Sequence, residues 1–138
     1  MPLAIDSRPA VWFHVDVTVV DPRPRIVVAP DGAPHVAGVR CQACAEPVAY
    51  PWPACPECGG PVVAAEFGPE GVVWSATVVR IPVAGRTPPY ALAYVDLDDG
   101  PRVLAHVVVD GDGDTAPAVG TRVRLRAGAP DPQVEVIG

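Results

Sequence analysis

Residues 41–60 read CQACAEPVAYPWPACPECGG and contain all four cysteines of the chain. These form two Cys-x-x-Cys pairs, Cys41 with Cys44 and Cys55 with Cys58, separated by ten residues. Two intervening residues let one tight turn present both sulfurs to the same ion, and zinc prefers four tetrahedral ligands. The spacing predicts one structural Zn²⁺ per chain with a closed ligand set, with a rubredoxin-like iron site or two disulfides as alternatives.

The residues before and within this stretch predict a β-hairpin that leads into a zinc ribbon. Residues 26–29 and 35–40 have strand character and flank the turn sequence PDGAP, residues 30–34. Proline sets φ for the entry to such a turn, and Gly32 accepts a positive φ. Gly59, directly after Cys58, can also adopt a positive φ, whereas the equivalent position of the first cysteine turn is Ala45, a less favourable residue there.

The remainder of the chain predicts a series of strands and no amphipathic helix. The expected strands are residues 62–67, 71–81, 90–97, 102–109, 121–127 and 133–137, separated by turn residues. A ribbon followed by about five strands predicts an OB-fold barrel, so the fold class is all-β. Residues 11–19 also alternate with period two. The expected organisation is an extended segment at 1–24, the hairpin and zinc ribbon at 25–65, and the OB-fold at 66–138.

Composition restricts the classes of partner. The chain of 138 residues contains ten arginines and no lysine, and its formal net charge is −6. This negative charge disfavours non-specific binding to nucleic acid. No apolar run approaches the roughly 18 residues needed to span a bilayer. The N-terminus lacks the pattern of a secretory signal, so the chain is expected in the cytoplasm and away from membranes.

Several segments, in order, resemble one family. They are IVVAPDGAPHVAGVRC (26–41), CQAC with AYPWPACPECGG (41–60), GVVWSATVVRIP (71–82), PPYALAYVDLDDGPRVLAHVV (88–108) and VGTRVRL (119–125). The chain is similar to the acyl-CoA-associated zinc-ribbon/OB-fold family, catalogued as domain of unknown function 35. The resemblance covers about four-fifths of the chain, and the segment 88–108 makes it specific.

The resemblance implies a non-catalytic subunit of a thiolase-like enzyme or of an acyl-CoA hydratase. Some members of the family act in steroid side-chain degradation, and in some the OB-fold is reported to hold CoA. Members often have glycine where this chain has Ala45. They also often have an arginine shortly before the third cysteine, where this chain reads Trp52-Pro53-Ala54.

Candidate binding residues lie outside the cysteine cluster. Trp52, between Pro51 and Pro53, is expected to contact a partner, because aromatic residues are common anchors of interfaces. Arg86 and Tyr90, together with the strip of Arg122 and Arg124, are the candidates for lying close to CoA; the alternative for the strip is a solvated barrel face. Trp74 and His106 are expected in the core.

The sequence offers no catalytic residue, because four metal-bound cysteines leave no free thiol and no histidine has a matched nucleophile. The leading hypothesis is an accessory subunit of an aldolase, thiolase or acyltransferase that acts on acyl-CoA thioesters. The alternatives are a subunit of an acyl-CoA hydratase complex and a nucleic-acid-binding ribbon/OB module.

Overall fold

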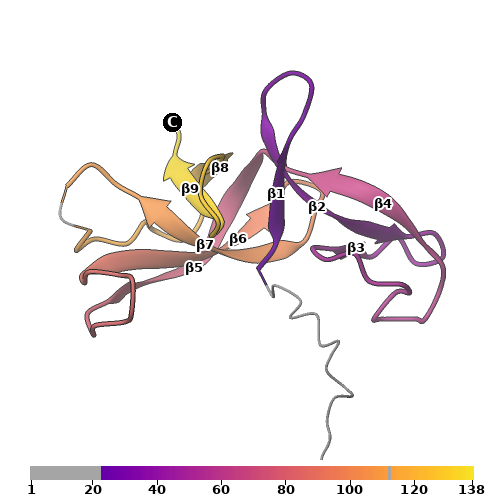
Figure 1. Ribbon diagram of the computed structural model, residues 1–138, viewed down its shortest axis with the longest axis horizontal. Coiled ribbons are helices and arrows are strands. Elements are labelled where there is room, and N and C mark those ends of the chain that lie inside the picture. Colours follow the sequence, from indigo (N-terminus) through magenta and orange to yellow (C-terminus); the bar gives the residue numbers. More distant parts are fainter. Residues whose placement is uncertain (1–22, 112) are drawn as a thin grey trace, which may run out of the picture.

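The computed structural model describes residues 23–111 and 113–138, and these residues form nine strands and no helix. A four-stranded sheet precedes a closed five-stranded barrel in the chain (Figure 1). The all-β prediction of a hairpin and ribbon followed by an OB-type barrel is confirmed. The predicted strand at 11–19, and all of the expected extended segment except residues 23 and 24, lie outside the described residues.

The ribbon sheet is built around its longest strand. It contains β1 (Arg25–Val28), β2 (Pro34–Cys41), β3 (Pro47–Val48) and β4 (Val62–Phe67). β1 and β3 pair with successive parts of one edge of β2, and β4 pairs with the other edge, all antiparallel. The turn between β1 and β2 closes because Asp31 Oδ1 accepts a hydrogen bond of 2.9 Å from the Ala33 N–H, while Gly32 has φ of 85°.

A close backbone approach at Gly38 directs the chain after β3 across the sheet. A Cβ at Gly38 would lie 2.0 Å from the carbonyl oxygen of Val48, a distance that no side chain can occupy. The backbone of Val48 and Ala49 therefore lies against the face of β2 at Gly38. The sequence at this point permits the crossing because glycine has no side chain.

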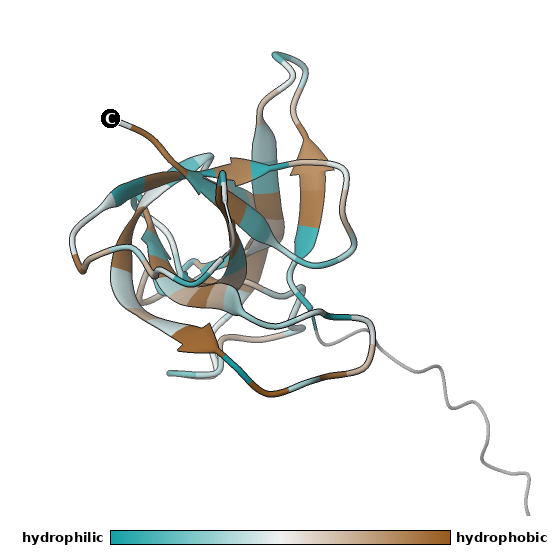
Figure 2. Cartoon of the chain, turned by 90° about the vertical axis from the view of Figure 1, so that its left-hand side faces the viewer, coloured by the Kyte–Doolittle hydropathy of each residue, from teal (hydrophilic) through white to brown (hydrophobic). Residues whose placement is uncertain are grey.

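The barrel closes in the order β5-β6-β7-β9-β8. Its strands are β5 (Glu70–Val79), β6 (Tyr90–Leu97), β7 (Arg102–Val108), β8 (Arg122–Arg126) and β9 (Gln133–Val136). β7 and β9 are parallel, and the other neighbours are antiparallel. Inward and outward residues alternate along β6, β7 and β8, as a half-buried strand requires. Figure 2 shows that hydrophobic and hydrophilic residues are interspersed along the barrel strands.

One core joins the ribbon to the barrel. Most of its buried side chains come from the barrel, and the largest include Val73, Val95, Val123, Leu125 and Val134. The ribbon contributes three buried residues to the same cluster, and these are Val36, Ala49 and Phe67. Because side chains of both modules interdigitate, the two pack as a continuous body.

Two predicted core positions are wrong. Trp74 follows the buried Val73 in β5, so alternation places it on the outside with half of its surface exposed, at a β-bulge against β6. Its ring then packs against Arg102, whose guanidinium carbon lies 3.7 Å from the ring centroid. His106 faces outward because the inward residues of β7 are Val103, Ala105 and Val107.

In the part of the chain that the structure describes, no helix has the length and apolar character needed to cross a membrane.

Candidate metal centre and adjoining surfaces

The four cysteine sulfurs converge at one end of the ribbon. Cys41 Sγ lies 3.6 Å from Cys58 Sγ, and Cys44 Sγ lies 3.7 Å from Cys55 Sγ. All four sulfurs lie within 4.8 Å of one another. A tetrahedral ion with metal–sulfur bonds of about 2.3 Å separates its sulfurs by about 3.8 Å, so the residues fit a four-thiolate site.

The two cysteine turns repeat the same hydrogen-bond pattern. The N–H of Cys41 donates to the Glu46 carbonyl, and the N–H of Cys55 donates to the Gly60 carbonyl, both at 3.0 Å. Further amides are directed at sulfur: those of Ala43 and Cys44 lie 3.3 Å from Cys41 Sγ. In the second turn, the Glu57 N–H lies 3.4 Å from Cys55 Sγ. N–H groups directed at sulfur stabilise the thiolate form that a metal requires.

The thiols of the cluster differ in acidity. The N–H of Cys44, together with that of Ala43, lowers the pKa of Cys41 to about 6 against an opposing effect of burial. For Cys44, the N–H of Glu46 lowers the pKa, but burial and the neighbouring thiols outweigh it and raise the pKa to about 12. Four sulfurs this close repel one another when all are ionised, and a divalent cation removes that repulsion. The chemistry of the ligand set therefore favours a bound metal.

A groove of about 920 Å³ lies between the ribbon and the barrel. We call it the ribbon groove. It is lined by residues 23–26, by residues 49–53 and by residues 129 and 130 of the β8–β9 loop. Trp52 is half exposed there, and its ring centroid lies 6.0 Å from that of Tyr50. The structure thus places Trp52, Pro51 and Pro53 together on one wall, next to an aromatic residue, Tyr50, that the sequence did not single out.

A second cluster lies where two barrel loops meet. Arg86, from the β5–β6 loop, donates a hydrogen bond of 2.6 Å to Asp131 of the β8–β9 loop. Arg23 donates to the other oxygen of Asp131 at 2.9 Å. The hydrogen bond from Arg23, and then that from Arg86, lowers the pKa of Asp131. Arg86 also lies 6.0 Å from the ring centroid of Tyr90, so the structure brings these two candidate residues together.

His106 completes this cluster. Its ring centroid lies 5.7 Å from that of Tyr90, and its Nε2 lies 3.7 Å from Asp131. Burial lowers the pKa of His106, Arg86 adds to this effect, and Asp131 opposes it. Asp131 was not predicted as a site residue. The available signal was its position between two prolines in the last loop of an OB-fold, a loop that often contacts ligands.

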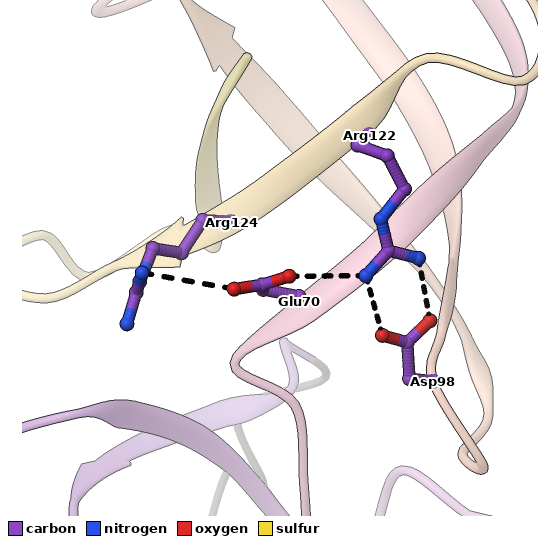
Figure 3. A network of polar contacts seen from close by, with 4 residues as sticks. All are labelled: Glu70, Asp98, Arg122 and Arg124. Carbon is purple, nitrogen blue, oxygen red and sulfur yellow. Dashed lines mark hydrogen bonds and ion pairs between the residues drawn. The ribbon is translucent and has the colours of Figure 1, made fainter. Parts of the chain in front are cut away.

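Arg122 and Arg124 lie apart from Arg86 and Tyr90. Arg122 pairs across strands with Val72 near the start of β5, whereas Tyr90 pairs with Val79 at its end. Figure 3 shows that the guanidinium of Arg122 makes two hydrogen bonds to Asp98, of 2.8 and 2.6 Å, and one of 3.0 Å to Glu70. Arg124 lies 3.7 Å from the second oxygen of Glu70. Hydrogen bonds to Asp98 and then Glu70 raise the pKa of Arg122, so its charge is already matched within the barrel.

Comparison with known proteins identifies the barrel. Residues 64–128 match the family model described as "ChsH2, C-terminal OB-fold domain". The barrel is similar to the OB-fold domain of this family. The resemblance inferred from the sequence is thus confirmed.

A solved structure of this family extends the match to most of the chain. It is titled "Ltp2-ChsH2(DUF35) aldolase" and shares 27% sequence identity with a TM-score of 0.60, covering 74% of this chain and 84% of that one. No curated protein sequence matches. The ChsH2-like chain is thus similar in fold and sequence to a component of an aldolase complex.

The repeated turns predict opposite effects of exchanging alanine and glycine. Ala45 has φ of 67° and Gly59 has φ of 77°, so both occupy the left-handed region. We expect Ala45→Gly to raise the unfolding free energy of the metal-loaded protein by about 1 kcal/mol, and Gly59→Ala to lower it by about as much. Chemical denaturation followed by circular dichroism measures both. Equal stability of the two variants would contradict the assignment of strain to Ala45.

Proposed function

We propose that this chain is a non-catalytic accessory subunit of a thiolase-superfamily enzyme that acts on acyl-CoA thioesters. The observation that carries the proposal is the similarity to the Ltp2-ChsH2(DUF35) aldolase, which covers three-quarters of the chain and therefore more than the barrel alone. Within this role we propose a function in the metabolism of steroid or other lipid side chains. The aldolase relative favours this proposal over a hydratase complex.

The charges of the described residues disfavour the nucleic-acid alternative. Every described arginine except Arg25 has a guanidinium nitrogen within 3.7 Å of a carboxylate oxygen. Binding to nucleic acid depends on cations that neutralise phosphates. Arginines that already pair with carboxylates do not form a basic patch for phosphates. This supports a protein partner.

The first test concerns the metal, which we propose to be zinc. A closed set of four thiolates stabilises a fold and leaves no open position for water or substrate. We expect elemental analysis to find about one zinc per chain. The Cys55→Ser variant should lose the metal, because the sulfur of Cys55 is one of the four proposed ligands. The metal end of the ribbon should then unfold, while the barrel keeps its strands. Iron in place of zinc, or a folded protein without metal, would contradict the proposal.

The ribbon groove is the proposed docking surface for the enzyme. Trp52 exposes 51% of its surface although it is one of the largest apolar side chains, and prolines on both sides limit its backbone. An aromatic residue held rigidly beside a groove loses little conformational entropy on binding. The ring of Tyr50 lies next to the ring of Trp52. These contacts favour Trp52 as an anchor.

Replacing Trp52 tests the docking surface. We expect Trp52→Ala to weaken association with the enzyme by about 2 kcal/mol or more, because a buried aromatic anchor is lost. Isothermal titration calorimetry measures the affinity. Val119→Ala is the control, because Val119 is 73% exposed but lies in the β7–β8 loop outside the groove. If both variants bind as tightly as the wild type, the ribbon groove is not the docking surface.

We further propose that the loops near Arg86 and Tyr90 lie close to the CoA end of the substrate. These loops correspond to the loops with which OB-folds contact ligands. Their cluster also adjoins the ribbon groove, since Arg23 lines the groove and binds Asp131. An enzyme docked at the groove would therefore lie next to Arg86. Arg122 and Arg124 lie at the other end of β5 with their charges matched, which favours a structural role for them.

Kinetics of the reconstituted complex separate a direct role of Arg86 from an indirect one. We expect Arg86→Ala to raise the KM for acyl-CoA by about tenfold, the effect of losing one charge-assisted hydrogen bond, while association is unchanged. Asp131→Asn is the control, because it weakens the contact between the loops and keeps the cation. Arg124→Gln should leave the KM unchanged. If Asp131→Asn raises the KM as much as Arg86→Ala does, Arg86 acts by holding the loop.

A further inference from the structure

Strand β1 has one edge without a partner among the described residues. β1 pairs only with β2, so its other edge faces away from the sheet. Ala29 donates a hydrogen bond of 2.9 Å to Ala33, and hydrogen-bonded pairs alternate along an antiparallel ladder. The next bonded pairs are therefore Val27 with His35 and Arg25 with Ala37. It follows that the backbone N–H and C=O groups of Ile26 and Val28 point outward.

The ribbon groove adjoins the start of this free edge. Of the four consecutive residues 23–26 that line the groove, Arg25 and Ile26 belong to β1. Successive side chains of a strand point to opposite faces, so a lining that includes both residues places the groove at the edge of β1 and not over one face. Across the groove lie the apolar side chains of residues 49–53, including Trp52.

The charge beside the edge indicates the chemistry of a ligand. Arg25 is exposed and forms no ion pair with any residue in the ranges 23–111 and 113–138. All other described arginines form ion pairs with carboxylates. An unpaired backbone edge, an apolar wall and an unmatched cation together fit an extended peptide with apolar side chains and an acidic residue.

We propose that an extended segment of the partner enzyme adds a strand to the free edge of β1 in the ribbon groove. The backbone of this segment forms hydrogen bonds with the backbone of Ile26 and Val28. Its apolar side chains contact Tyr50 and Trp52, and an acidic residue forms an ion pair with Arg25. This inference rests on the proposed accessory function, and it names the kind of enzyme segment that docks. Backbone hydrogen bonds supply the affinity, and the groove supplies the specificity.

A second copy of the chain fits the same edge less well. Each chain carries a formal net charge of −6, so two copies repel one another. The cation at the edge, in contrast, attracts an acidic segment of another protein. The residues before Arg23 are a further candidate occupant, and the experiment distinguishes all three.

Hydrogen exchange of the full chain, alone and in complex with the thiolase-like enzyme proposed as its partner, tests the proposal. We expect the amides of Ile26 and Val28 to exchange at least about tenfold more slowly in the complex. The amide of Val27, which already bonds β2, should be protected in both samples. Protection of Ile26 and Val28 in the free chain at all concentrations would assign the edge to the chain's own N-terminal segment. Protection that rises with concentration of the free chain would assign it to a second copy. Either result overturns the proposal.

A pair of variants gives an independent measurement. Val28→Pro removes the outward backbone N–H of this residue, which is 59% exposed, and Val28→Ala keeps that N–H. We expect Val28→Pro to weaken association by about tenfold relative to Val28→Ala, the effect of one or two backbone hydrogen bonds. If the enzyme binds but neither exchange nor affinity changes, the strand addition is wrong and the accessory function stands. If the enzyme does not bind the wild type, both are wrong.

Discussion

The convergence of four sulfurs on one point is the constraint on which the ribbon depends. The two turns that carry them contain few buried apolar side chains apart from the cysteines themselves, of which Cys41 and Cys55 are buried. A small sheet of this kind has too little core to stay folded by burial alone. A metal bound by four thiolates replaces the missing core, because its binding free energy becomes folding free energy. Residues 49–53, which form a wall of the groove, lie in the chain between the two cysteine pairs that such a metal would join.

At the other end, the ribbon is held by the barrel. Val36, Ala49 and Phe67 are buried in the same cluster as the barrel strands. Gly38 allows the chain after β3 to cross β2 at contact distance, which brings Ala49 into that cluster. The ribbon therefore carries the four-cysteine cluster at one end and is held by apolar packing at the other. The groove lies between these two attachments.

Local patterns in the sequence were sufficient to predict the architecture. Cysteine spacing predicted which four sulfurs converge, and period-two alternation predicted the strands, because both depend on residues close together in the chain. The outward positions of Trp74 and His106 were not predicted. The bulge beside Trp74 depends on the register with β6, and the face of His106 is decided by which neighbours of β7 close the barrel. The ion pairs of Arg86 with Asp131 and of Arg122 with Glu70 join residues 45 and 52 positions apart, and a single sequence carries no signal for such pairs.

The shared core also has a consequence for selectivity between enzymes. Because ribbon and barrel share one core, packing sets the separation between the ribbon groove and the start of the barrel. On the docking proposed above, a partner would have to present two complementary regions at a matching distance and angle. An enzyme with a suitable docking segment but a differently placed substrate entrance would satisfy only one of them. Discrimination between related enzymes would then come from geometry, without any repulsive contact on this chain.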